Sequence, residues 1–180
     1  MNIEEIHRLF LATSGISTDT RKLVPNSLFF ALKGDHFNGN QFAAQALAEG
    51  CAYAIIDEKE FALSDRYILV ENVLQTIQQL ANYHRRQFNI PVLGITGSNG
   101  KTTTKELIGA VLSTTYTTLI TEGNLNNHLG VPLTLLRLNM DHEIAIIEMG
   151  ASKPGDIQEL AEIAEPTHAI ITNIGAAHIE

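Results

Sequence analysis

Residues 92–104 read VLGITGSNGKTTT, and this stretch decides the fold of the second half of the chain. The apolar residues 92–96 predict a buried strand, the glycines after them predict a tight turn, and a helix is expected to begin at Lys101. In such a turn the backbone N–H groups can point at an anion, and the helix N-terminus adds a positive dipole. We therefore predict a phosphate-binding loop, with the Lys101 ammonium near the terminal phosphates of a nucleoside triphosphate.

The loop residues favour ATP with Mg²⁺ as the ligand. Those expected to bind this cofactor are Gly97, Ser98, Asn99, Gly100, Lys101, Thr102 and Thr103. Thr102 is placed to ligate the Mg²⁺ ion. The spacing from Gly94 to Gly100 is one residue longer than in the standard pattern, so we expect a shorter loop that starts at Gly97. The plain alternative is a glycine turn before an exposed lysine. It leaves unexplained a cation at a helix N-terminus, where the dipole disfavours it by about 0.3–1 kcal/mol.

The rest of the second half alternates between apolar strands and helices. We expect strands at 92–96, 117–120, 143–148 and 168–172, and helices at 101–113, 131–138 and 156–164. This alternation implies right-handed crossovers and a parallel sheet with helices on its faces, so the predicted fold class is α/β.

Glu148 and His178 each follow an apolar run. Ligands of open parallel sheets bind at the carboxyl ends of the strands, the edge that also carries the phosphate loop. We therefore expect both side chains to converge on Lys101, and we assign catalytic roles to Lys101, Glu148 and His178. Metal binding is assigned to Thr102, Glu148 and His178. Taken alone, a glutamate at a strand end is more often a solvated or capping residue, and a single histidine is more often structural.

The first half has a less regular pattern. We expect helices at 2–11, 42–47 and 73–88, strands at 28–32, 52–56 and 67–70, and a polar loop at 13–21. Asn38 or Asn40 can cap the second helix, and Gly50 provides its left-handed end. His84 lies on the apolar stripe of the third helix, where we expect a boundary residue.

Composition limits where the protein can work. The chain has 180 residues, 44% of them hydrophobic and 18% charged, which suits one globular domain or two small ones. Its net charge of −8 argues against nucleic-acid binding, which relies on clustered Lys and Arg. No apolar run approaches the roughly 20 residues that cross a bilayer, and the acidic start is unlike a secretory signal. We expect a cytoplasmic protein without membrane insertion, in which the single Cys51 forms no internal disulfide and is buried.

Beyond the phosphate loop, a series of landmarks resembles the Mur ligase family of bacterial peptidoglycan synthesis. They are residues 17–21, 28–34, 96–106, 123–127, 130–136, 148–151 and 173–180. The loop, Glu148 and His178 match positions that the whole family shares. The segment 123–136 and the Lys105-Glu106 continuation most resemble the member that adds D-alanyl-D-alanine to UDP-N-acetylmuramoyl-tripeptide.

The resemblance implies two domains. Residues 1–72 would form a small α/β N-terminal domain that binds the UDP moiety, and residues 73–180 would form part of a P-loop-containing parallel-sheet ATPase domain. The substrate-binding residues implied are Thr18, Asp19, Thr20, Arg21, Lys33, Gly34, Asn126 and Asn127. Residues 35–40 depart from the Asp-Gly-His form common in related ligases. Residues 18–21 could equally form a plain loop whose side chains satisfy their own backbone.

The activity implied is ATP-dependent amide formation through an acyl phosphate. UDP-N-acetylmuramoyl-tripeptide and D-alanyl-D-alanine would be the substrates, ATP and Mg²⁺ the cofactors, and the parent protein a monomer. The adenine pocket, a metal-bridging lysine and the C-terminal domain of the family would lie beyond this chain, so we expect a fragment that is inactive alone. Two alternatives remain: a Mur-type ligase that adds a different amino acid, and a non-catalytic P-loop nucleotide-binding module. A GTPase-like module would carry Asp-x-x-Gly and Asn-Lys-x-Asp motifs, which the sequence lacks.

Overall fold

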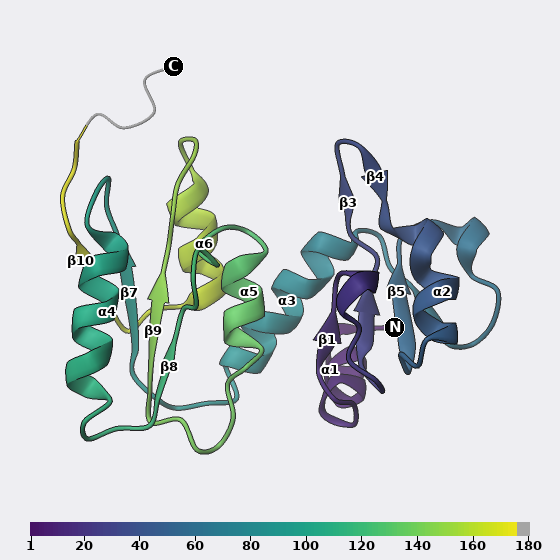
Figure 1. The fold of residues 1–180 in the computed structure, drawn as a ribbon, viewed down its shortest axis with the longest axis horizontal. Coiled ribbons are helices and arrows are strands. Elements are labelled where there is room, and N and C mark those ends of the chain that lie inside the picture. The colour runs from purple at the N-terminus through teal and green to yellow at the C-terminus, as the bar shows by residue number, and fades with distance from the viewer. Residues whose placement is uncertain (176–180) are drawn as a thin grey trace. The chain divides into compact units, whose positions relative to one another are not determined.

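The computed structural model describes residues 1–175 and divides the chain into two compact units, Met1–Leu80 and Ala81–Glu180 (Figure 1). The division falls within helix α3 (Val73–Arg85), so this helix contributes to both units. No helix in the described range is long and apolar enough to cross a membrane.

The first unit is built on a parallel sheet with strand order β1-β2-β5-β6. The strands are β1 (Ile16–Ser17), β2 (Leu28–Phe30), β5 (Tyr53–Ile56) and β6 (Tyr67–Leu69). The helices are α1 (Ile3–Leu11), α2 (Ala43–Ala48) and the first part of α3, with 3₁₀ turns η1 (Thr20–Lys22), η2 (Gly39–Phe42) and η3 (Lys59–Phe61). A separate antiparallel hairpin joins β3 (Lys33–Gly34) to β4 (Phe37–Asn38) and projects from the unit (Figure 1).

Local sequence explains the elements of this unit. Asn2 and Glu5 form a capping box that satisfies backbone N–H groups at the start of α1. Between α2 and the sheet, Phe29, Ala46 and Ile56 belong to one buried apolar cluster. Cys51 is fully buried in the same cluster and is a free cysteine, as the sequence predicted.

The prediction of a polar loop throughout 13–21 is wrong. Ser17 and its neighbour Ile16 form β1, and residues 20–22 form η1. The Ser17 hydroxyl is buried, lies 2.9 Å from Ser27 Oγ and accepts a hydrogen bond of 3.0 Å from the Val24 N–H. A strand of two residues that buries a satisfied polar side chain leaves no apolar periodicity to detect.

The expected helix cap is displaced by one element. Asn38 caps η2 by accepting a hydrogen bond from the Asn40 N–H, whereas α2 begins without a side-chain cap. The chain therefore enters α2 through a 3₁₀ turn, a common way for an α-helix to begin. Gly50 does follow α2 with a φ of 108°, so the left-handed stop is confirmed.

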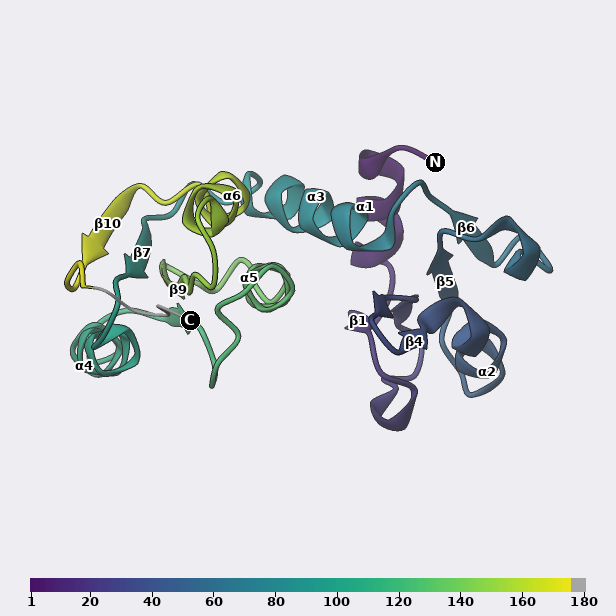
Figure 2. The ribbon, with the colours of Figure 1, turned by 90° about the horizontal axis from the view of Figure 1, so that it is seen from above.

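The second unit has a four-stranded parallel sheet with order β10-β7-β9-β8. Its elements are β7 (Val92–Thr96), α4 (Lys101–Leu112), β8 (Thr118–Ile120), α5 (Gly130–Leu135), β9 (Ile144–Glu148), α6 (Asp156–Ala164) and β10 (His168–Ile171). Figure 2 shows α4 on one face of this sheet and α6 on the other. The parallel α/β architecture predicted from the alternating pattern is confirmed.

The last residues of α3 anchor this unit. His84 is buried, and its Nε2 lies 2.9 Å from the Leu138 carbonyl oxygen, so its expected place at a boundary is wrong. Burial lowers the pKa of His84, although the bond to the Leu138 carbonyl acts in the opposite direction. Arg85 donates hydrogen bonds of 3.2 Å to the Ala164 and Glu165 carbonyls at the end of α6. These bonds satisfy carbonyls that the helix leaves without partners.

Candidate functional site

The turn between β7 and α4 requires glycine at two positions. Gly97 and Gly100 have φ angles of 136° and 81°, which side-chain-bearing residues rarely adopt. A Cβ atom on Gly97 would also lie 2.2 Å from Thr172 Oγ1, whereas one on Gly100 would meet no atom within 4 Å. Gly97 is therefore required by both backbone and space, and Gly100 by backbone alone.

The segment after β10 forms hydrogen bonds to the turn between β7 and α4. The Ser98 N–H donates to the Asn173 carbonyl at 3.2 Å, and the Asn99 N–H donates to Asn173 Oδ1 at 3.0 Å. Ser98 Oγ donates to the Gly175 carbonyl at 2.9 Å. These contacts were not predictable from the sequence, because nothing in the pattern around Asn173 distinguishes an anchoring residue from an ordinary loop residue.

The N–H groups of the first turn of α4 are available to face an anion. With glycine at the N-cap position, α4 begins without a side-chain cap, whereas Ser98 and Asn99 already use their N–H groups in the bonds to Asn173. An uncapped helix N-terminus carries unsatisfied donors and the positive end of the dipole. Residues 101–103, which the sequence assigned to phosphate binding, form this turn.

Lys101 folds back over the turn. Its Nζ donates to the Gly97 carbonyl at 2.6 Å and to the Ser98 carbonyl at 3.3 Å. Among the ion pairs of the described residues, none involves Lys101. Its charge is thus oriented by dipoles rather than compensated by a carboxylate, which suits contact with an incoming phosphate.

Glu148 ends β9 beside the turn, with only 1% of its surface exposed. The Thr102 hydroxyl donates to Oε1 at 3.1 Å, and Asn126 Nδ2 donates to the same oxygen at 2.9 Å. Oε2 accepts no hydrogen bond from the described residues. The structure therefore brings together Thr102 and Glu148, as expected, but buries a carboxylate that could have been a solvated strand end.

The oxygen atoms at this point fit a Mg²⁺ ion. A carboxylate, a hydroxyl and a side-chain amide are the kinds of oxygen ligand that hard divalent cations prefer. The buried Oε2 of Glu148 has lone pairs that the described residues leave unused. His178, the third expected metal ligand, lies outside the described residues.

The two asparagines of the next loop have different tasks. Asn126 donates a hydrogen bond to Glu148 Oε1. Asn127 Oδ1 instead accepts hydrogen bonds from the N–H groups of Leu129 at 3.1 Å and Gly130 at 2.8 Å, so it supports the entry to α5. These contacts are structural, and they fix the loop from which Asn126 reaches the carboxylate.

Lys105 belongs to the site, although its sequence pattern did not predict this. It is fully buried on α4, and its Nζ donates to the Thr121 carbonyl at 2.8 Å and lies 3.8 Å from Glu148 Oε2. One signal was available: Lys105 stands one helical turn after Lys101, on the same face of α4. Without the strand order, that spacing does not show which face meets the sheet.

The two basic residues among the candidate substrate residues of the first unit, Arg21 and Lys33, each pair with carboxylates. Arg21 forms an ion pair of 2.6 Å with Asp19, and the Arg21 side chain and N–H hold the pKa of the Asp19 carboxyl at about 2. Thr18 and Thr20 are half-buried next to this pair.

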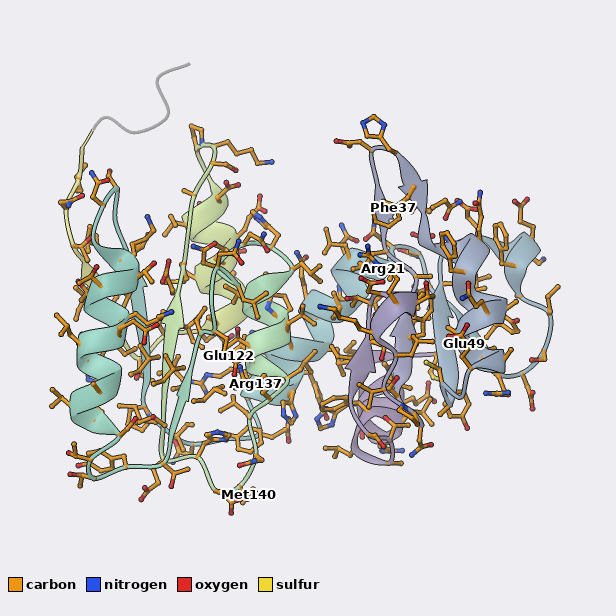
Figure 3. All side chains as sticks on the ribbon, viewed as in Figure 1. Arg21, Phe37, Glu49, Glu122, Arg137 and Met140 are labelled. Carbon is orange, nitrogen blue, oxygen red and sulfur yellow. The ribbon has the colours of Figure 1, made fainter. Side chains whose placement is uncertain are left out.

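Lys33 also has acidic partners. Its Nζ lies 2.9 Å from both Asp57 and Glu58, and Gly34 is exposed beside it on β3. Phe37, labelled in Figure 3, is exposed on the same hairpin. A diphosphate that bound Lys33 would have to compete with two carboxylates, so the structure brings no uncompensated cation to this position.

Comparison with known proteins matches two family models to this chain. Residues 12–92 match the family model described as the Mur ligase family catalytic domain, and residues 95–180 match the Mur ligase middle domain. A Bacillus subtilis (strain 168) protein is 45% identical over 168 residues, which is 92% of this chain and 37% of that protein. An Escherichia coli (strain K12) protein is 40% identical over 98% of this chain and 39% of its own length. Both are named UDP-N-acetylmuramoyl-tripeptide--D-alanyl-D-alanine ligase.

Solved structures agree in fold. The MurF ligase from Thermotoga maritima, solved in complex with ADP, superposes with a TM-score of 0.86 at 38% identity and covers 94% of this chain and 40% of that one. A MurF structure from Acinetobacter baumannii gives 0.85 at 42% identity, with 91% and 36% covered. The chain spans about 37% of the length of the first curated relatives that it matches.

Proposed function

This chain belongs to the Mur ligase family, and we propose that it forms the UDP-binding part and the phosphate-binding part of a ligase that joins D-alanyl-D-alanine to UDP-N-acetylmuramoyl-tripeptide. One observation carries the proposal. Asn126 belongs to the segment that most resembles this member of the family, and it donates a hydrogen bond to Glu148, which the resemblance matches to a carboxylate of the whole family. Eight relatives that carry this name are 36–48% identical over 92–99% of the chain.

The proposed reaction has two steps. The terminal carboxylate of the tripeptide attacks the γ-phosphorus of ATP, which gives an acyl phosphate and ADP. The amine of D-alanyl-D-alanine then attacks the acyl carbon, releases inorganic phosphate and forms the amide. Phosphoryl transfer depends mainly on positioning and on charge stabilisation. Lys101 and the N–H groups of residues 101–103 would supply both to the phosphates. The ADP complex of the Thermotoga maritima relative supports nucleotide binding here.

We propose Mg²⁺ as the metal of this site. Thr102 and Glu148 would hold it, with His178 as the partner expected from the sequence. When bound, the ion would neutralise phosphate charge and orient the phosphate oxygens. The residues themselves prepare this arrangement, because Thr102 and Asn126 fix Oε1 of Glu148 and leave Oε2 without a hydrogen bond.

The first unit would bind the UDP end of the substrate. We propose residues 18–21 and residues 33–34 as contacts, with the domain boundary near residue 72. Because Arg21 and Lys33 are paired with carboxylates, substrate binding would require exchange of these ion pairs for contacts to the diphosphate. Asn126 would lie near the reacting groups, while Asn127 would support the loop.

The parent protein is proposed to be a cytoplasmic monomer that does not bind nucleic acid. The net charge of −8 argues against nucleic-acid binding. The buried Cys51, which is a free cysteine, suits the cytoplasm.

A product assay tests the function. The complete protein that contains this chain is incubated with ATP, Mg²⁺, UDP-N-acetylmuramoyl-tripeptide and D-alanyl-D-alanine, and the products are measured by mass. We expect a UDP-muramyl-pentapeptide and one ADP for each amide formed. Parallel reactions replace D-alanyl-D-alanine with D-alanine, D-glutamate or a diamino acid. Product formation with one of these and none with D-alanyl-D-alanine would overturn the assignment.

A further inference from the structure

The proposed reaction does not explain why Lys105 forms a buried ion pair with Glu148. The exposed fractions of the two side chains are 0% and 1%, and they come from α4 and β9, which pack against each other. A buried charge without compensation is strongly unfavourable, and lysine is among the residues least often fully buried. An apolar side chain would fill the same space without the free energy of desolvating a charge. The presence of an ammonium group at this position therefore requires an explanation.

The contacts of Lys105 show how it is held. Nζ donates to the Thr121 carbonyl at 2.8 Å, just after β8, and lies 3.0 Å from Glu106 Oε1. These two partners fix the ammonium at 3.8 Å from Glu148 Oε2, beyond hydrogen-bonding distance. The cation therefore compensates the carboxylate without occupying its lone pairs.

The two oxygens of Glu148 are thereby made different. Oε1 receives hydrogen bonds from Thr102 and Asn126, which fix the orientation of the carboxylate. Oε2 has a cation nearby but no hydrogen bond from the described residues. A buried carboxylate oxygen without a hydrogen bond is expected where a metal ion supplies the missing contact.

Resting on the proposed function, we propose that Lys105 is the built-in counter-ion of the metal site and acts as a positioning residue. It offsets the charge of Glu148 when no metal is bound, so the fold tolerates a buried carboxylate whose Oε2 accepts no hydrogen bond from the described residues and keeps its lone pairs for Mg²⁺. The Lys105 ammonium and Mg²⁺ would then repel each other across the same carboxylate. Removing Lys105 should make the protein less stable without metal, and it should make Mg²⁺ bind more tightly.

A purely structural lysine predicts something different. If Lys105 only filled space and bonded the Thr121 carbonyl, its replacement would lower stability equally with and without Mg²⁺. The metal dependence of the change in stability therefore separates the two roles, and no activity measurement is needed.

The test uses the complete protein in four forms: wild type, Lys105→Met, Glu148→Gln and the double variant. Unfolding is first followed in EDTA. We expect each single variant to be less stable than wild type, and the double variant to be more stable than the sum of the two changes predicts, because no charge is left unpaired. Glu106→Gln is the matched control, since it removes the exposed acidic partner of the same ammonium.

Mg²⁺ is then titrated at constant ADP, with thermal unfolding as the readout. We expect the half-saturating Mg²⁺ concentration of Lys105→Met to fall about tenfold below that of wild type, and that of Glu106→Gln to stay within about threefold. Additive effects in EDTA, or an unchanged Mg²⁺ dependence in Lys105→Met, would overturn the proposal. If Lys105→Met does not fold, we still expect the double variant to fold. A double variant that does not fold, although Glu148→Gln does, would also overturn the proposal. A wild-type protein with no Mg²⁺-dependent stabilisation would instead count against the proposed function, and the EDTA cycle would still test the ion pair.

Discussion

The Thr102 hydroxyl donates a hydrogen bond of 3.1 Å to Glu148 Oε1 across 46 positions of sequence. Strand order makes this possible. β7 pairs with β9, and Ile95 is in register with Glu148, so the turn that follows β7 lies next to the end of β9. The phosphate loop and the buried carboxylate therefore form one site.

Lys101→Ala should abolish most of the ATP-dependent activity of the complete protein. The side chain supplies a cation that no described carboxylate compensates, and it is positioned by the Gly97 and Ser98 carbonyls. Removing one such charge-stabilising group typically lowers kcat by about 10²–10³. ADP release in the presence of both substrates measures the loss, with the exposed Lys59→Ala as control. Activity of Lys101→Ala within a factor of a few of wild type would refute the assignment.

Gly97→Ala should disrupt the phosphate loop more than strain alone can explain. The added Cβ would lie 2.2 Å from Thr172 Oγ1 and 3.0 Å from the Asn173 backbone, so the loop must move away from its tether. Gly155→Ala is a matched control, because Gly155 also has a positive φ, of 96°, but has open space for a Cβ. Its cost is limited to backbone strain of about 1–2 kcal/mol.

Calorimetric titration with ATP and Mg²⁺ compares these two glycine variants. We expect the affinity of Gly97→Ala to fall at least about tenfold, which corresponds to ~1.4 kcal/mol, while Gly155→Ala binds as wild type does. Equal affinities for the two variants would show that the tether to residues 172–175 is not needed for binding.

Glu148→Gln should weaken the metal dependence without affecting the UDP end of the substrate. Glutamine keeps the shape of glutamate and an oxygen that can accept from Thr102 or Asn126, but it loses the charge that attracts Mg²⁺. We expect the Mg²⁺ concentration for half-maximal activity to rise at least about tenfold. UDP-substrate binding, measured without ATP, should be unchanged. His178→Ala is predicted from the sequence to have the same effect. Loss of folding in both variants would mean that the residues serve structure rather than metal binding.

The sequence predicted the second unit well because its elements are regular. The position of Lys101 follows from an apolar strand, two glycines and a helix in succession. The apolar run before Glu148 predicts a strand, which places Glu148 at the carboxyl end of that strand. Burial of Lys105 was not predictable, because it depends on which face of α4 meets the sheet and on the neighbouring carbonyl of Thr121.

The first unit was harder to predict for a physical reason. β1, β3 and β4 have two residues each, too few to show a period. The tether from Asn173 to the phosphate loop has the same difficulty, since it depends on backbone contacts between distant segments rather than on a local pattern.

The carboxylates around Lys33 should make the first unit sensitive to acid. Burial raises the pKa of Asp57, but hydrogen bonds from Lys33 and Asn40 outweigh it, and the net pKa is lowered. Hydrogen bonds from Lys33 and Asn38 lower the pKa of Glu58. Groups whose pKa is lower in the folded state stabilise it above their unfolded pKa of about 4, and this contribution is lost as the pH falls through the folded values.

Lys33→Met tests this linkage because the lysine itself does not titrate in acid. Its pKa is raised by Asp57 and Glu58, so it stays charged at every pH below its unfolded value of about 10.4. We expect the variant to unfold at lower urea concentration than wild type at pH 7, and the difference to shrink as the pH falls below about 4, where the carboxylates become neutral. Lys59→Met, on an exposed 3₁₀ turn, should show neither effect. A difference between wild type and Lys33→Met that stays constant from pH 7 to pH 3 would show that Lys33 stabilises the unit by packing of its aliphatic stem, and not through the charges of Asp57 and Glu58.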